Sequence, residues 1–493
     1  MYYIGIDLGT SAVKTLLMDA QGHIIKIVSR TYDLEFPFQG WSQQRPEDWE
    51  DAVFSAIAEL ICGIDAAQVS GIGVGGQMHG LVVLDDDDAV IRPAILWNDG
   101  RTGKETEWLN TVIGKQQLSS WTGNIAFAGF TAPKLMWMET NEPENFQRIR
   151  HILLPKDFVV HRLTGAYTCD YSDASGMLLL DVAHKCWSKE MMNVCHIKQE
   201  QLPTLYESYQ VVGNLTKDAA KRLGLPETVK VVAGAGDNAA AAVGTGTVGA
   251  GKCNLSIGTS GTIFITNDAF TVDSHNGLHA FAHADGGFHL MGCMLSAAAC
   301  NKWWMEDILG STAFQEEQRG ITDAMLGCNS VYFLPYLMGE RSPHNDPLAR
   351  SAMIGMTLDT RRADMVQAVL EGVAFGIRDS LEIAKAQGIA VERSKICGGG
   401  AKSPLWRKIF ANVLNLPLDI IEVEEGPGLG AAILAAVGCG EYATVEQAAN
   451  AIVRVKDTIE PDPMIAARYE AQYDVFCKLY PTMKPLFPLL SRN

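Results

Sequence analysis

The segment Ile4-Gly5-Ile6-Asp7-Leu8-Gly9-Thr10-Ser11 decides how the rest of the chain is interpreted. Its apolar residues lead into an aspartate at the expected end of a strand, and the flanking glycines let a bulky polyanion approach the backbone. A second aspartate has the same setting in Val231-Val232-Ala233-Gly234-Ala235-Gly236-Asp237-Asn238. A carboxylate so placed can hold a metal–phosphate group or accept a proton. Two of them predict a division of labour, one for Mg²⁺ and phosphate and one for an attacking hydroxyl.

A second copy of this segment lies about half the chain further on. Leu255–Ile265 repeats the order strand, Gly-Thr-Ser, strand that Leu8–Val13 shows, and the alignment sets Ser256 opposite Asp7. Around the first copy, alternating residues predict strands at about 2–8, 11–18 and 23–31. A repeat at equivalent points of two hairpins indicates an internal duplication. One hairpin then keeps a carboxylate for a metal, and the other offers hydroxyl and backbone N–H groups to phosphate oxygens.

Helical patterns follow the strands in both halves. Glu47–Ile61 and Lys156–Leu163 are expected to be helical in the first half. In the second half, Thr360–Gln387 carries apolar residues at spacings of three and four and stops at Gly388. Strands that alternate with helices predict α/β layers in each half. We therefore expect two α/β domains, 1–245 and 246–493, joined near residues 240–255.

The bulk composition narrows the class of protein and its partners. A chain of 493 residues with 47 % hydrophobic and 20 % charged residues is typical of a soluble protein with two domains. The formal net charge of −17 argues against a nucleic-acid partner, although a nucleotide needs only local donors and a metal. The start lacks a signal peptide's basic region, and Asn238–Gly251, the longest uncharged stretch of small residues, is shorter than the ~18 residues of a membrane span. We expect a cytoplasmic protein without a membrane partner. The 11 cysteines have no Cys-x-x-Cys spacing, which favours buried thiols over a zinc site.

Some short motifs have simpler explanations than a binding site. Gly244–Gly249 fits the dinucleotide pattern G-x-G-x-x-G, but it follows a helix-like alanine run and leads into a strand, the reverse of the required context. The sequence contains no Walker A motif. Asp85–Asp88 lies between two apolar runs, which predicts a solvated hairpin turn rather than a cation site. Asp7 could instead be the capping acid of a tight turn. Asp237 could be the N-cap of the helix that follows it, although a cap and a catalytic group can coincide.

Three other loops carry polar or glycine-rich sequences. Gly75–Gly80 reads Gly-Gly-Gln-Met-His-Gly and places a histidine after a strand, where a ligand role and a structural role are equally open. Ile95–Arg101 adds a tryptophan and several hydrogen-bonding groups of the kind that sugar sites use. Gly398–Gly400 precedes Ser403 and Pro404, the expected N-cap and first residue of a helix. Its glycines either reverse the chain or form a flat surface for a purine ring. Spacing alone leaves open whether these loops meet.

Together these segments resemble the FGGY family of carbohydrate kinases, within the larger actin, Hsp70 and hexokinase-like group of ATPases. The resemblance covers essentially the whole chain and includes the segments 4–11, 77–80, 92–99, 130–137, 153–157, 236–238, 256–261 and 339–345. The glycine-bounded acids are shared by the whole superfamily. The Gln-Met-His-Gly corner is more specific: it is similar to that of members that phosphorylate xylulose, whereas glycerol kinases carry an Arg-Glu pair there. Ala12, where many relatives have glycine, is a mild departure.

The resemblance implies two ribonuclease-H-like domains with ATP and Mg²⁺ in the cleft between them and a sugar deep in the first domain. Asp7 is then expected to hold Mg²⁺, and Asp237 to accept the proton of a primary 5-hydroxyl as it attacks the γ-phosphorus. Met78 and His79 are expected to contact the ketose, together with Asp237, and Asn238 to hold its hydroxyl groups. The ATP-binding residues implied by the resemblance are Thr10, Ser11, Gly258, Thr259, Ser260, Gly399, Gly400, Ala401 and Ser403.

The reaction implied by the resemblance is ATP-dependent phosphorylation of D-xylulose to D-xylulose 5-phosphate and ADP, in pentose catabolism. A related kinase that acts on ribulose, a deoxy-ketose such as deoxy-xylulose, or a polyol is the nearest alternative. A non-catalytic, ATP-gated sugar-binding or actin-like assembly protein belongs to a different class, which the retention of both aspartates disfavours. Because family members often form dimers, a homodimer is a further expectation. The sequence leaves open whether Ser11, Asn98 and Asp99 touch a ligand.

Overall fold

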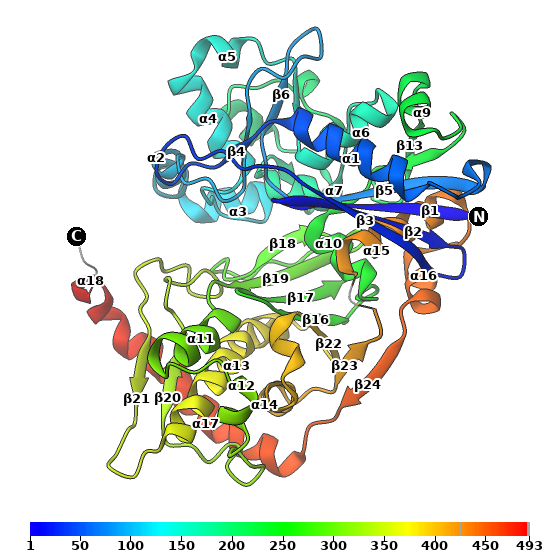
Figure 1. The fold of residues 1–493 in the computed structure, drawn as a ribbon. Helices are drawn as coiled ribbons and strands as arrows, with labels where there is room; N and C mark the ends of the chain where they lie inside the picture. The colour runs from blue at the N-terminus through cyan, green and yellow to red at the C-terminus, as the bar shows by residue number, and fades with distance from the viewer. Residues whose placement is uncertain (424, 491–493) are drawn as a thin grey trace.

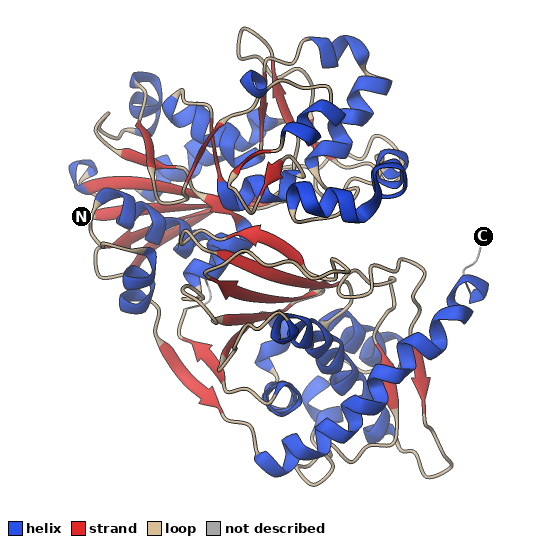
Figure 2. Cartoon of the chain, turned by 180° about the vertical axis from the view of Figure 1, so that it is seen from behind, coloured by secondary structure: helices blue, strands red, loops and turns tan. Residues whose placement is uncertain are grey.

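The computed structural model describes residues 1–423 and 425–490 and shows two α/β domains (Figure 1). The first half of the chain, blue to green, builds the upper domain of that view, and most of the second half builds the lower one. Seen from behind, the sheets are flanked by helices (Figure 2). The two-domain α/β architecture expected from the sequence is confirmed.

Each domain is built on a mixed β-sheet, and the two sheets share the arrangement of their central strands. The first has the spatial order β13 (Val211–Asn214), β14 (Lys230–Val232), β5 (Val69–Gly76), β1 (Tyr2–Leu8), β2 (Ala12–Asp19) and β3 (Ile24–Thr31), with β15 (Ala235–Gly236) also paired to β5. The second has the order β18 (His279–Ala282), β19 (Phe288–Met294), β17 (Gly261–Asn267), β16 (Cys253–Ile257), β22 (Ser394–Cys397), β23 (Leu418–Ile421) and β24 (Val455–Ile459). β1 runs antiparallel to β2 and parallel to β5, as β16 does to β17 and β22. This correspondence confirms the internal duplication.

The core of the first domain follows from the alternation along β1. Ile4 and Ile6 join the apolar cluster that also contains Trp49 of helix α1 (Pro46–Leu60). Tyr3 points to the other face and joins a cluster with Leu429 of α15 (Gly426–Cys439). A strand buried on both faces needs apolar side chains at successive positions, as β1 has.

Helix α15 comes from the second half of the chain yet packs on the first sheet, beside α10 (Asp237–Gly244). Glycines allow this close approach. A Cβ at Gly5 would lie 2.0 Å from the Gly428 carbonyl oxygen, and one at Gly430 would lie 1.8 Å from the carbonyl oxygen of Ala240 in α10. Because Asp237 is the first residue of α10, this packing fixes where its carboxylate can lie.

The predicted elements are present with small shifts of their ends. α1, α6 (Pro155–Thr164) and α13 (Arg362–Ala386) cover the three expected helices. Ser403 caps α14 (Pro404–Leu414), since its hydroxyl accepts from the Trp406 amide at 3.2 Å. The alternative that Asp237 is the N-cap of α10 does not hold: the N-cap is Gly236 and Asp237 is the first helical residue, although its carboxylate accepts from the Asn238 amide at 2.7 Å. The glycine pattern at 244–249 ends α10 and leads towards β16, so its interpretation as a non-nucleotide segment is consistent with the fold.

Further helices and short strand pairs complete the described chain. The other helices of the first half are α2 (Gly103–Trp108), α3 (Lys115–Thr122), α4 (Thr131–Asn141), α5 (Pro143–Gln147), α7 (Tyr171–Ala174), α8 (Lys189–Val194) and α9 (Lys217–Leu223). Those of the second half are α11 (Ala298–Trp303), α12 (Phe314–Gln318), α16 (Val445–Ile452), α17 (Pro463–Met483) and α18 (Phe487–Leu490). The short strand pairs are β4 (Gln43–Gln44) with β7 (Ala94–Ile95), β6 (Val82–Leu84) with β8 (His151–Leu153), β9 (Thr168–Asp170) with β12 (Thr204–Tyr206), β10 (Leu180–Asp181) with β11 (Cys186–Trp187), and β20 (Tyr332–Leu334) with β21 (Ala352–Ile354). Among the described residues, every helix is too short or too polar to cross a membrane.

Candidate active site

The two glycine-bounded aspartates lie at the same edge of the first sheet. In the strand register Asp7 of β1 is opposite Gly75 of β5, and Gly75 is opposite Ala235 of β15, two residues before Asp237. These strands are parallel, so their carboxyl ends meet at one edge. Two strand spacings separate the aspartates' backbones by about 10 Å. Gly75 and Gly76 between them let other segments pack closely, since an added Cβ would lie 3.0 Å from the Cβ of Ala240 and 2.7 Å from the Cβ of Lys156, respectively.

Burial gives both carboxylates unusual acidities. Burial raises the pKa of Asp7 to about 6, although Lys14 on the neighbouring strand lowers it. Burial is also the main cause that raises the pKa of Asp237 to about 7, and the negative charge of Asp7 contributes to that rise. The two carboxylates are therefore close enough to interact electrostatically. A carboxylate with a pKa near neutrality can take up and release a proton in the physiological range.

A cavity of about 470 Å³ opens beside Asp237 and is lined by both halves of the chain. Met78, His79, Asp237 and Asn238 contribute from the first half, as the resemblance predicted, together with Trp97 of the 95–101 loop. The second half contributes a larger set, which consists of Ser260, Gly261, Thr262, His279, Phe281, Met291, Cys293, Met294, Leu295, Met338 and Arg341. The lining is mainly apolar with a few convergent polar groups, as is usual for a small-molecule site.

His79 is held in one orientation inside this cavity. Its Nδ1 lies 2.8 Å from the Gly176 carbonyl oxygen, and its ring packs against Phe130 at an interplanar angle of 31°, with centroids 4.7 Å apart. Burial lowers its pKa to about 3, so the imidazole is neutral. Because a carbonyl oxygen can only accept, the proton sits on Nδ1, and Nε2 remains as an acceptor for a ligand hydroxyl.

The backbone around His79 is fixed by a buried cation. His79 has a left-handed conformation, with a φ of 69°. The Nζ of Lys134 in α4 donates to the carbonyl oxygens of His79 and Gly129, both at 2.8 Å. Sequence reasoning assigned no role to Lys134, although it lies in the segment 130–137 that carries the family resemblance. Its apolar neighbours in α4 gave no sign that its ammonium group would lie beneath the His79 loop.

Two Gly-Thr-Ser turns face the region where the domains meet. Gly9–Ser11 joins β1 to β2, and Gly258–Ser260 joins β16 to β17 at the equivalent position. Thr259 and Ser260 are exposed, and so is Ser11. The Thr10 hydroxyl accepts from the Trp97 indole N–H at 2.9 Å, which links the first turn to the cavity lining. Exposed hydroxyls and backbone N–H groups at such turns suit phosphate oxygens.

A second cavity, of about 510 Å³, lies in the second domain and adjoins the first. Thr259 lines the second cavity and its neighbour Ser260 lines the first, so the turn between β16 and β17 connects them. Gly399, Gly400 and Ser403 also line the second cavity, with a set that sequence reasoning missed: Ala298, Ala299, Asn301, Lys302, Trp303, Glu306, Asp307, Phe314, Gln315, Gln318, Lys402 and Trp406. Ala401 is buried and is not among its lining residues.

The structure also distinguishes among the residues of the 95–101 loop, whose contact with a ligand the sequence left open. Asp99 is buried and forms an ion pair with Arg101, at 2.8 Å, and it accepts from the Ser42 amide. It therefore holds a loop rather than a ligand. Asn98 lines a different surface hollow, beside Phe36–Ser42. Of this loop, Trp97 alone lines the cavity that contains Asp237.

Arg341 gives the first cavity a positive charge. Its guanidinium lies 5.1 Å from the centre of the Phe127 ring, across the domain boundary. Among the residues that line the cavity, Asp237 is the one carboxylate and Arg341 the one arginine or lysine. Its positive charge acts on the neighbouring Glu340 and Cys293, where it lowers the pKa against the raising effect of burial. The segment 339–345 carried the resemblance, but nothing in it indicated that Arg341 would line the same cavity as Asp237.

The donor set was also compared with what a metal ion requires. Among residues 1–423 and 425–490, no three His, Cys, Asp or Glu side chains form a group that could hold a metal ion by themselves. Mg²⁺ in phosphotransferases takes only one or two carboxylates and completes its shell with water and phosphate oxygens. The partly exposed carboxylate of Asp7, beside the Gly9–Ser11 turn, fits that requirement.

Comparison of the sequence with known proteins gives matches along its whole length. The N-terminal domain of the FGGY family of carbohydrate kinases matches residues 2–244, and the C-terminal domain of that family matches residues 253–439. The chain is 39 % identical over 487 residues to the xylulose kinase of Escherichia coli strain K12, covering 98 % of this chain and 99 % of that protein. It is 38 % identical over 488 residues to the xylulose kinase of Bacillus subtilis strain 168, covering 98 % of each.

Solved structures give the same fold. A xyloylose kinase from Brucella ovis superposes with a TM-score of 0.93 at 38 % identity, over 99 % of this chain and 100 % of that one. A gluconate kinase from Lactobacillus acidophilus superposes with a TM-score of 0.94 at 26 % identity, over 99 % of each chain. The overall fold is thus shared by kinases that are named for different sugars.

Proposed function

Because the chain belongs to the FGGY family of carbohydrate kinases, we propose that it transfers the γ-phosphoryl group of ATP to the 5-hydroxyl of D-xylulose. The products are D-xylulose 5-phosphate and ADP. The observation that carries the proposal is that successive residues of one turn line the two cavities, Ser260 the cavity with Asp237 and His79, and Thr259 the second cavity. A sugar in the first cavity and a nucleotide in the second can then meet at their reacting ends. Full-length similarity to xylulose kinases supports the choice of sugar.

In this mechanism Asp237 is the general base. The proton of the 5-hydroxyl passes to its carboxylate, the bond from O5 to the γ-phosphorus forms, and the bond from that phosphorus to ADP breaks. His79 accepts from a sugar hydroxyl through Nε2, Asn238 holds another, and Met78 forms an apolar wall. A positioned base contributes about 10²–10⁴-fold, so positioning and charge stabilisation supply most of the acceleration.

The proposal divides the rest of the work between the two domains, 1–245 and 246–493. Asp7 would hold Mg²⁺, which neutralises charge on the phosphate groups. Thr10 and Ser11 from one turn, and Gly258, Thr259 and Ser260 from the other, donate to phosphate oxygens. The surface formed by Gly399, Gly400, Ala401 and Ser403 takes the adenosine. Because the sugar cavity is lined from both domains, binding of the sugar favours the arrangement that excludes water.

A panel of acceptors tests the sugar assignment. ADP release is measured with D-xylulose, D-ribulose, 1-deoxy-D-xylulose, gluconate and glycerol at equal concentrations. D-xylulose is expected to give the highest kcat/KM by at least about tenfold. That is the scale of the loss when one polar group of the site has no partner on the acceptor. Gluconate is included because its carboxylate could pair with Arg341. Faster turnover of any other acceptor would replace the proposed substrate, and ATP binding without turnover of any sugar would favour a sugar-binding protein.

Asp237→Asn tests the base. The amide cannot accept the proton, so kcat should fall by about 10²–10⁴-fold while the Kd for ATP stays within about threefold. Asp86→Asn is the matched control, since Asp86 lies in the solvated 85–88 turn with its side chain 91 % exposed. Turnover near the wild-type rate in Asp237→Asn would refute the assignment.

A further inference from the structure

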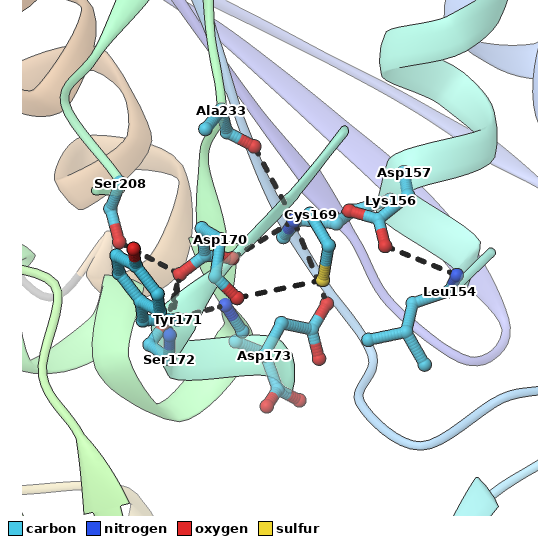
Figure 3. Close-up of polar contacts among 12 residues, drawn as sticks. Leu154, Lys156, Asp157, Cys169, Asp170, Tyr171, Ser172, Asp173, Ser208 and Ala233 are labelled. Atoms are coloured by element: carbon cyan, nitrogen blue, oxygen red, sulfur yellow. Dashed lines mark hydrogen bonds and ion pairs between the residues drawn. The ribbon is translucent and has the colours of Figure 1, made fainter. Parts of the chain in front are cut away.

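A fully buried lysine lies behind Asp237, surrounded by three aspartates (Figure 3). The Nζ of Lys156 is 2.6 Å from Asp157, 2.9 Å from Asp170 and 3.8 Å from Asp173. None of the four side chains is more than 1 % exposed. They lie outside the cavity lining, so a direct contact with the sugar does not explain them.

This cluster holds the backbone that leads into Asp237. Lys156 donates to the carbonyl oxygen of Ala233 at 3.3 Å, and the amide of Gly236 donates to the hydroxyl of Ser172 at 3.2 Å. The hydroxyl of Ser172 in turn donates to Asp170 at 2.5 Å. With its own proton committed to Asp170, that hydroxyl presents a lone pair to the Gly236 amide. A chain of contacts thus runs from Lys156 to Asp170 and Ser172, which are labelled in Figure 3, and from Ser172 to Gly236, the residue directly before the base.

Stability alone is a poor reason for such a cluster. Taking charges out of water costs several kcal/mol per ion, and packed apolar residues often replace a buried ion pair without loss. One lysine cannot balance three ionised aspartates. Burial raises the pKa of Asp173 well above its usual range, which favours the neutral form of that carboxyl. The charge of Lys156 is directed at the backbone of Ala233–Gly236. Its effect there is to fix the geometry of that segment.

We propose that Lys156, Asp170 and Ser172 are positioning residues that aim the carboxylate of Asp237 at the sugar hydroxyl. The inference rests on the proposed function, because it requires Asp237 to be the base. Glycine makes the support necessary: Gly234 has a φ of 79°, and Gly236 lies against Met78, so these two positions have no side chains of their own to anchor them. A fixed hydroxyl and a fixed ammonium group replace them.

Ser172→Ala is the direct test, with kcat expressed per folded active site. A misplaced base should lower kcat by at least about tenfold, since small displacements of a reacting group have large effects, while the KM for ATP stays within about twofold. Water that enters beside the loosened loop should also lower the pKa of Asp237. The acid limb of kcat/KM for D-xylulose therefore moves to lower pH. If Ser172 had only a structural role, Ser172→Ala would not shift the acid limb of the kcat/KM profile.

Two further variants make the test specific. Ser188→Ala is the matched control, because Ser188 is buried and accepts from the Met191 amide at 3.3 Å but lies away from Asp237; its kcat and pH profile should match the wild type. Asp170→Asn should reproduce the loss seen in Ser172→Ala, and the double variant should lose no more than either single variant, because both act through one chain of contacts.

The outcomes separate this inference from the proposed function. If Asp237→Asn is inactive but Ser172→Ala has the wild-type kcat and acid limb, the positioning system is refuted and the base stands. If the losses in kcat of the two single variants multiplied in the double variant, the idea that both residues act through one chain of contacts would also be refuted. If Asp237→Asn keeps its turnover, the proposed function itself fails.

Discussion

The acidity of Asp237 is the residue-scale property with the most direct kinetic signature. Its pKa is raised to about 7 by burial and by Asp7, and the carboxylate accepts a proton only when ionised. In the free enzyme kcat/KM for the ketose should therefore rise with pH and level off above a midpoint near 7. Rates measured from pH 5 to 9 in buffers of constant ionic strength check this. A midpoint near 4, the ordinary value for an aspartate, would contradict it.

Gly176 offers a second test at the scale of one residue. A Cβ at this position would lie 2.3 Å from Cε1 and Nδ1 of His79, so Gly176→Ala must displace the imidazole. The KM for D-xylulose should rise by about tenfold, equivalent to the loss of one hydrogen bond, while the KM for ATP changes less than twofold. Gly320→Ala, where an added Cβ meets nothing within 4 Å, is the control. Equal effects on both KM values would assign His79 a structural role.

At the scale of elements, the contact between α10 and α15 joins the two halves of the sequence. An alanine normally stabilises a helix relative to glycine by about 1 kcal/mol. At Gly430 the added Cβ would instead lie 1.8 Å from the Ala240 carbonyl oxygen, so the two helices must separate. We expect Gly430→Ala to lower the free energy of unfolding by about 1–3 kcal/mol, the usual cost of overpacking, and to lower kcat because α10 begins with Asp237.

The matched control for that helix pair is Gly103→Ala. Gly103 begins α2, and an added Cβ there meets nothing within 4 Å. Chemical denaturation and initial rates of both variants measure the two effects. A Gly430→Ala protein as stable as Gly103→Ala would show that the helices can part without cost.

At the scale of the whole molecule, side chains of the first half cover the edge of the second sheet. Asn124 donates to the Ala280 carbonyl oxygen at 2.9 Å and accepts from the Ala280 amide at 3.2 Å. Ser175 accepts from the amide of Ala282 at 3.0 Å. Ala280 and Ala282 belong to β18, the edge strand, whose free backbone groups need partners. These bonds hold the two domains together beside the sugar cavity, which His279 and Phe281 of the same strand line.

Weakening this contact should let water compete with the sugar. We expect Asn124→Ala to release more ADP than sugar phosphate, whereas the wild type releases the two in equal amounts, because a less closed site admits water as a nucleophile. The ratio of the two products measures the effect. Asn145→Ala is the control, since Asn145 bonds to Glu142 within the first domain. A ratio of one in Asn124→Ala would mean that the Asn124 contact does not restrict water.

Local sequence determined the elements and much of the candidate site. Alternation predicted β1, β2 and β3, the Gly-Thr-Ser repeat predicted the duplicated hairpin, and the glycine-bounded acids predicted which strand ends matter. These features depend on residues that are neighbours in the chain, where backbone conformation follows from side-chain branching and from glycine. The resemblance then supplied His79, Asn238 and the turn at Gly258–Ser260, which the structure brings to the two adjoining cavities.

Tertiary structure alone decided what lies behind and across from those residues. Lys134, Lys156 and Arg341 are ordinary charged residues in the sequence, yet two are fully buried beneath the site and the third lines the cavity of Asp237 from the other domain. α15 belongs to the second half by position and to the first sheet by packing. The physical reason is that burial, ion pairing and shifted acidity depend on distances between segments far apart in the chain. Such distances are set by how glycine-lined sheets and helices fit together.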